Sequence, residues 1–150
     1  MDRLEFYLDI IKNNLEDIKR YKNKISTFLP INYKNYEELQ FHSKDTLDAI
    51  AFRFTKLQSL LGEKVFKLFI EKTGFDTNEK SFLEILSELE RLNIVKRDEW
   101  IRLREIRNKI SHEYPDEIDE IIDNLNKIIE SIKTFEKIYK KIKEKYEALK

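Results

Sequence analysis

Cysteine is absent from the 150-residue chain, and glycine and proline occur only twice each. Without cysteine the chain can form neither disulfides nor thiolate metal sites. Two glycines cannot build a glycine-rich phosphate loop, and so few chain breakers favour long helices. No apolar run approaches the roughly 18 residues of a membrane span, and the first residues, MDRLEFYLDII, do not read as a secretion signal. We therefore expect a cytoplasmic protein with no membrane partner.

The charged residues are abundant but balanced. They make up 39% of the chain, with 29 basic and 29 acidic residues and a formal net charge of zero. Net charge therefore does not point to a polyanionic partner, and any RNA-binding surface must be a local patch. Hydrophobic residues reach 41%, which is enough for one core, so residues 1–150 are expected to form a single domain.

Apolar residues recur at spacings of three and four along most of the chain, which predicts amphipathic helices. No strand-like alternation flanked by turn signals occurs. We therefore predict an all-α fold, an antiparallel bundle of four to five helices. The expected helices are 2–28 with Asp2 as N-cap, 43–61 with a continuation after a kink or interruption at Gly62, one opened by Ser81, one capped by Asp98, and a long final helix from Pro115 and Asp116. The stretch NYKNYEEL is expected to be a loop or short turn, and GFDTNEK is expected to be a loop.

Positions 107 to 114 read RNKISHEY and hold one of the two histidines. A histidine near a helix end is often an ordinary capping or hydrogen-bonding residue, and its charge suits the helix C-terminus. On one continuous helix, Arg107 and His112 would point about 140° apart, at about 100° per residue. Tyr114 precedes a proline and is therefore disfavoured in helical geometry. A helix break here would bring Arg107, His112 and Tyr114 around one corner.

Such a corner suits metal-free acid–base chemistry. The chain contains no CxxC, no HExxH and no cluster of spaced carboxylates with histidine, so we expect no metal and no cofactor. A histidine can move a proton near neutral pH, and an arginine can bind a phosphate and stabilise developing charge. This pair fits RNA cleavage by the 2′-hydroxyl. Because that reaction uses both a base and an acid, a homodimer with two copies of the motif is expected.

Arg107, Asn108 and His112 match the RNxxxH signature of HEPN domains, small helical proteins of which many are metal-independent RNases. With Tyr114 the stretch resembles the narrower R-x4-H-x-Y form of HEPN toxins that are paired with minimal nucleotidyltransferase antitoxins. The segment AFRFTKLQSLLGEKVF, at 51–66, looks like the second helix of that group. The resemblance covers essentially the whole chain in length and helix order.

The resemblance implies a role for each matched residue. Arg107 would contact the scissile phosphate, His112 would act as general acid or base, and Asn108 would orient the site or bind RNA. Tyr114 would be the hydroxyl that the antitoxin adenylylates, which would block the RNase. The implied protein is an endoribonuclease toxin of a toxin–antitoxin pair. The alternatives are a non-catalytic HEPN-like partner of a nucleotidyltransferase and a structural bundle in which RNKISHEY is coincidence.

Other polar and aromatic residues allow two interpretations each. Arg53 could be a second phosphate contact, or it could pair with an acidic residue such as Glu105. His42 is expected to be exposed or capping, and Trp100 to lie in the core rather than stack on a base. Lys109 could meet an RNA backbone or simply be solvated.

Overall fold

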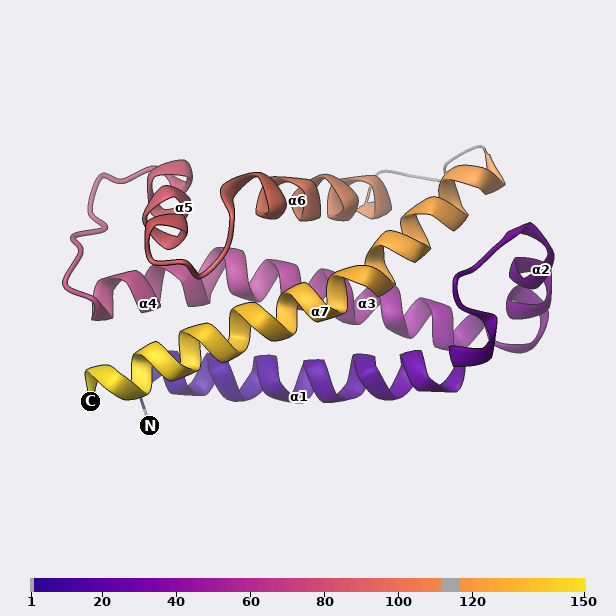
Figure 1. Cartoon of the computed structure of the whole chain (residues 1–150), viewed down its shortest axis with the longest axis horizontal. Coiled ribbons are helices and arrows are strands. Elements are labelled where there is room, and N and C mark those ends of the chain that lie inside the picture. Colours follow the sequence, from indigo (N-terminus) through magenta and orange to yellow (C-terminus); the bar gives the residue numbers. More distant parts are fainter. Residues whose placement is uncertain (1, 112–116) are drawn as a thin grey trace.

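The computed structural model describes residues 2–111 and 117–150, and within these ranges it contains helices and connecting segments but no strands. Long helices lie side by side, and successive long helices run in opposite directions (Figure 1). The prediction of an all-α antiparallel bundle is confirmed. The helices are α1 (Arg3–Lys24), α2 (Tyr33–His42), α3 (Lys44–Leu60), α4 (Phe66–Lys72), α5 (Phe82–Arg91), α6 (Arg97–Ser111) and α7 (Ile118–Leu149). A 3-10 turn, η1 (Ser26–Phe28), follows α1, and a π-helix, η2 (Leu61–Val65), joins α3 to α4.

One continuous core runs through the bundle. α1 packs on α3 and α7, α6 packs on α3 and α7, and α5 packs on α4 and α6. The apolar residues that recur at spacings of three and four along α1, α3 and α7 are mostly buried, and Trp100 is fully buried as expected. None of the described helices combines the length and the apolar character needed to cross a membrane.

Two local predictions were wrong. The segment NYKNYEEL is not a loop but the larger part of α2, which begins after a capping box formed by Asn32 and Asn35. Asp98 is not the cap of α6 but lies in its first turn; the backbone N–H of Arg97 instead donates to Glu90 Oε2 of the preceding helix at 2.7 Å. The expected caps Asp2 and Ser81 are confirmed.

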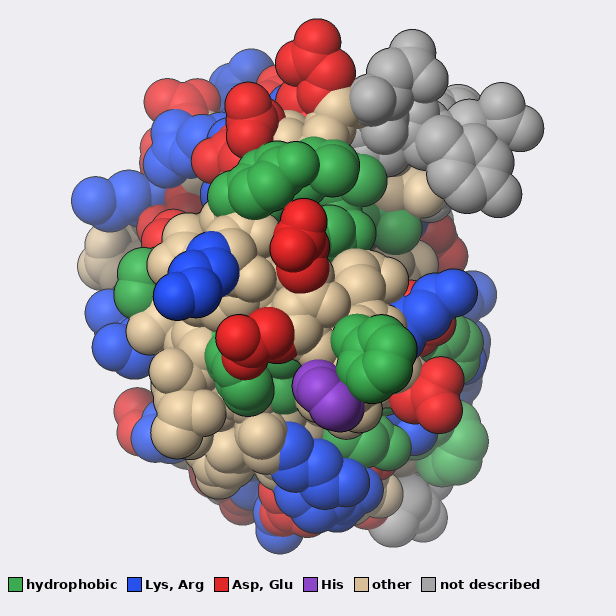
Figure 2. Space-filling view, turned by 90° about the vertical axis from the view of Figure 1, so that its right-hand side faces the viewer, with side chains coloured by type: hydrophobic (Ala, Val, Ile, Leu, Met, Phe, Trp, Pro, Cys, Tyr) green, Lys and Arg blue, Asp and Glu red, His purple; other side chains and the backbone are tan. Residues whose placement is uncertain are grey.

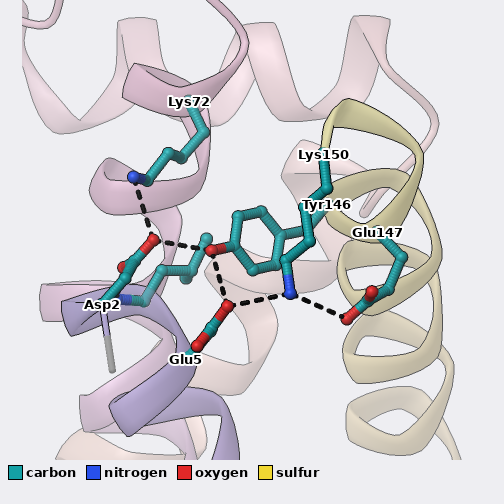
Figure 3. Close-up of polar contacts among 7 residues, drawn as sticks. Asp2, Glu5, Lys72, Tyr146, Glu147 and Lys150 are labelled. Atoms are coloured by element: carbon teal, nitrogen blue, oxygen red, sulfur yellow. Dashed lines mark hydrogen bonds and ion pairs between the residues drawn. The ribbon is translucent and has the colours of Figure 1, made fainter.

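A polar network joins the first turn of α1 to the last turns of α4 and α7 (Figure 3). The buried Tyr146 hydroxyl donates to Asp2 Oδ2 at 2.6 Å and approaches Glu5 Oε1 at 3.2 Å. Lys72 lies 2.9 Å from the same Asp2 oxygen, and Lys150 lies 2.8 Å from Glu5 Oε1. The hydrogen bond from Tyr146, with help from Lys72, holds the pKa of Asp2 well below its usual range. Lys150 and then Tyr146 lower the pKa of Glu5.

We expect Tyr146→Phe to destabilise the protein at pH 7 because it removes the hydroxyl that both carboxylates use. A depressed carboxyl pKa stabilises the fold above the ordinary pKa and loses that effect as the pH falls through the lowered value. The difference between wild type and variant should therefore be largest near neutrality and shrink below about pH 4. Thermal unfolding at several pH values measures it. Tyr139→Phe, a half-buried tyrosine of the same helix, is the control; an equal loss there would contradict the prediction.

Trp100 fixes α6 against η2 and α7. Its ring meets Phe66 edge-on at 4.6 Å between centroids and Phe135 at 6.2 Å. A Cβ added at Gly62 would lie 3.1 Å from Trp100 Cζ2. The indole therefore packs directly on the backbone of the π-helix, and Gly62 leaves the space that this close approach needs.

We expect Gly62→Val to lower the free energy of unfolding by about 1–3 kcal/mol, the usual range for overpacking a core contact. The added carbons would push into the indole of Trp100, which is fully buried and cannot turn away. Urea unfolding measures the change. Lys64→Val, at an exposed position of the same π-helix, is the matched control. If both variants lose the same stability, the contact with Trp100 is not the cause.

Candidate functional site

Arg107 lies on the face of α6 that enters the core. It follows Trp100 by seven positions and Leu103 by four, so the three side chains share one side of the helix. Trp100 and Leu103 are buried. Arg107 comes near the end of this face, and its side chain keeps 31% of its surface exposed. The guanidinium thus stands where the core of the bundle meets solvent.

The partners of Arg107 come from α3 and η2. Its Nη1 donates to Gln58 Oε1 at 3.0 Å and to Ser59 Oγ at 3.0 Å. Glu63 Oε1 lies 3.6 Å from the same nitrogen. Gln58 is only 2% exposed, so its amide oxygen offers a fixed acceptor. Arg107 is therefore held by one end of its guanidinium group.

The rest of that group remains available for an anion. A guanidinium carries five N–H donors, two of them on each terminal nitrogen and one on Nε. The hydrogen bonds to Gln58 and Ser59 use Nη1 alone. Nη2 and Nε make no hydrogen bond to another residue in the described ranges. An arginine with partial exposure and three donors that no described residue uses is suited to bind a phosphate or carboxylate through two parallel hydrogen bonds.

The motif lies where α6 gives way to α7. α6 is described to Ser111, and Glu117 has an extended backbone with φ −119° and ψ 130° before α7 begins at Ile118. The two helices are therefore separate, and α7 begins two residues later than Asp116. The predicted catalytic His112 and the predicted modification site Tyr114, with Pro115 and Asp116, lie outside the described residues. Asn108 is within them and is exposed on α6.

Arg53 faces a different part of the bundle. Its Nη1 donates to Asn14 Oδ1 at 2.8 Å, and its Nη2 lies 3.5 Å from Asp17 Oδ2, both on α1. On α3, Arg53 precedes Gln58 by five positions, about 140° around the helix. The structure therefore does not bring Arg53 beside Arg107. Of the two interpretations, pairing with an acidic residue is the one found, with Asp17 in place of Glu105.

Lys109 lines a groove of about 310 Å³ between α6 and α7. The charged side chains along it balance: Arg102, Lys109 and Lys127 against Glu99, Glu105 and Glu130. Basic and acidic side chains are also interspersed on the end of the molecule shown in Figure 2, which is the right-hand end in Figure 1. Lys109 therefore belongs to a surface of mixed charge.

His42 is exposed in the last turn of α2, as expected. In the described part of the chain, no three His, Asp or Glu side chains are grouped closely enough to hold a metal ion.

The acceptors of Arg107 were missed from the sequence. Gln58 and Ser59 are adjacent polar residues in the stretch FTKLQSLLG, and Glu63 follows Gly62. Two neighbouring polar residues on a helix cannot both face solvent if the helix is packed on several sides. That pattern was the available signal, but it does not name the partner, which lies 48 or 49 positions away.

In comparisons with known proteins, no family model, curated protein or solved structure matched the chain.

We expect Arg107→Ala to lower the free energy of unfolding by about 1–3 kcal/mol, because the buried acceptor of Gln58 loses its donor. Asn108→Ala, one position further on and exposed, should change it by no more than about 0.5 kcal/mol. Urea unfolding of both variants makes the comparison. Equal stability of Arg107→Ala and wild type would show that the contacts of Arg107 do not hold α6 to α3.

Proposed function

We propose that this protein is a metal-independent endoribonuclease of the HEPN type that acts as the toxin of a toxin–antitoxin pair. The observation that carries the proposal is Arg107 itself, the first residue of the RNxxxHxY motif. It is held by one terminal nitrogen, partly exposed, and set just before the junction of two separate helices. Its other donors make no hydrogen bond within the described ranges, which suits them to a phosphate.

The proposed reaction is transesterification of RNA. A 2′-hydroxyl loses its proton to a base and attacks the adjacent phosphorus, while the bond from phosphorus to the 5′-oxygen breaks. An acid returns a proton to that oxygen, so the products carry a 2′,3′-cyclic phosphate and a 5′-hydroxyl. Arg107 binds the non-bridging oxygens and stabilises their growing negative charge. His112 moves the proton, and a homodimer supplies a second His112 for the other proton transfer.

Control by an antitoxin completes the proposal. A partner nucleotidyltransferase transfers AMP from ATP to the Tyr114 hydroxyl and releases pyrophosphate. The added group places bulk and negative charge seven positions beyond Arg107 in the sequence, where it competes with RNA for the guanidinium. Asn108, exposed on the same turn of α6 as Arg107, is available to bind the RNA beside the scissile phosphate.

The test is cleavage of total cellular RNA by purified protein in the presence of EDTA. Wild type should cut, and His112→Ala should be slower by at least about a hundredfold, the scale of general acid–base catalysis. His42→Ala is the matched control, since it removes the other histidine, which is exposed on α2; it should cut like wild type.

Either of two results would refute this assignment. Equal cleavage by His112→Ala and wild type would place the catalytic group elsewhere. Absence of cleavage by unmodified, dimeric wild type would favour a non-catalytic partner of a nucleotidyltransferase.

A further inference from the structure

We propose that Gln58 and Ser59 are positioning residues for Arg107, and that Glu63 is a resident counter-ion which the RNA phosphate displaces. The inference rests on the proposed function, since it names the groups that prepare Arg107 for a phosphodiester. It concerns α3 and η2, which lie outside the RNKISHEY motif.

The positioning role follows from which nitrogen is bound. Both hydrogen bonds, to Gln58 Oε1 and Ser59 Oγ, use Nη1 at 3.0 Å. Two acceptors on one NH2 group fix the plane of the guanidinium group and keep the group from rotating at the end of the arginine side chain. Gln58 is 2% exposed, so it cannot follow a moving arginine. The edge formed by Nη2 and Nε is thereby kept in one orientation, which a bidentate contact with a phosphate requires.

Glu63 approaches the same nitrogen but does not form a hydrogen bond with it. Its Oε1 is 3.6 Å from Arg107 Nη1, beyond hydrogen-bonding length, and its side chain is 64% exposed. The two hydrogens of Nη1 already point to Gln58 and Ser59, so Glu63 contributes charge rather than a hydrogen bond. A carboxylate here balances Arg107 when no RNA is bound and repels a phosphate that approaches. Because it is exposed, it can swing into solvent when the phosphate arrives.

The counter-ion role is tested with Glu63→Gln and a single-stranded 2′-O-methyl RNA, which carries the phosphates but lacks the attacking hydroxyl. Loss of one exposed ion pair should tighten binding by roughly two- to fivefold. Adding one unit of positive charge anywhere strengthens RNA binding slightly, so a matched control is needed. Glu144→Gln provides it, with the same charge change at an exposed site near the C-terminal end of α7.

Tighter binding by Glu63→Gln than by Glu144→Gln, with the difference lost in high salt, would support the counter-ion role. Equal binding by the two variants would overturn it. This assay does not depend on cleavage. A wild type that binds the RNA analogue but cuts no RNA would therefore refute the proposed ribonuclease, while the two variants would still decide the role of Glu63.

The positioning role is tested by steady-state kinetics of Ser59→Ala and Ser59→Thr on a cleavable RNA. Loss of the hydroxyl frees Arg107 to rotate, so kcat should fall about tenfold or more with a smaller change in KM. Threonine keeps the hydroxyl and should restore kcat. An alanine variant with the kcat of wild type would overturn the role, as would a threonine variant as slow as alanine at an unchanged melting temperature.

Discussion

The packing of Trp100 on the backbone of Gly62 is the contact on which the rest of the bundle depends. A fully buried indole is the largest apolar group in this core, and it can come this close to a helix backbone only because Gly62 has no side chain. The contact fixes how far α6 lies from η2 and how it is rotated. Phe66 and Phe135 hold the same ring from α4 and α7, so one residue sets the mutual positions of four helical segments.

That rotation of α6 decides what Arg107 can do. Seven positions beyond Trp100, two turns of helix bring Arg107 back to the same side, facing Gln58 and Ser59. The residue therefore contributes to folding and to the candidate site at once. Two of its five donors bind acceptors of the bundle, and the other three make no hydrogen bond to a described residue. Loss of activity on mutating Arg107 would be ambiguous alone, whereas Ser59 and Glu63 can be changed without removing the guanidinium.

The sequence predicted the helices and caps that are set by residues close together in the chain. It missed the side-chain contacts that join residues far apart in the chain. Apolar spacing located the long helices, and local capping chemistry located the starts of α1 and α5 at Asp2 and Ser81. α2 was missed because Leu39 is its only buried residue, which leaves no apolar period; the Asn32–Asn35 capping pair was its one local signal. The partners of Arg53 and Arg107 depend on how helices rotate against each other, and no single-helix pattern contains that information.

The π-helix between α3 and α4 has a consequence for how the chain tolerates insertions and deletions. Phe66 N–H bonds back to the carbonyl of Leu61, five positions earlier instead of four, so this turn holds one residue more than an α-helical turn. Deleting one residue between Leu61 and Phe66 would leave this hydrogen bond spanning four positions, so the turn would become α-helical while α3 and α4 kept their present register. A single deletion is therefore expected to be tolerated better here than inside α3, where it would turn all that follows by about 100°. Its cost would fall on the turn itself, where Gly62 faces the indole of Trp100.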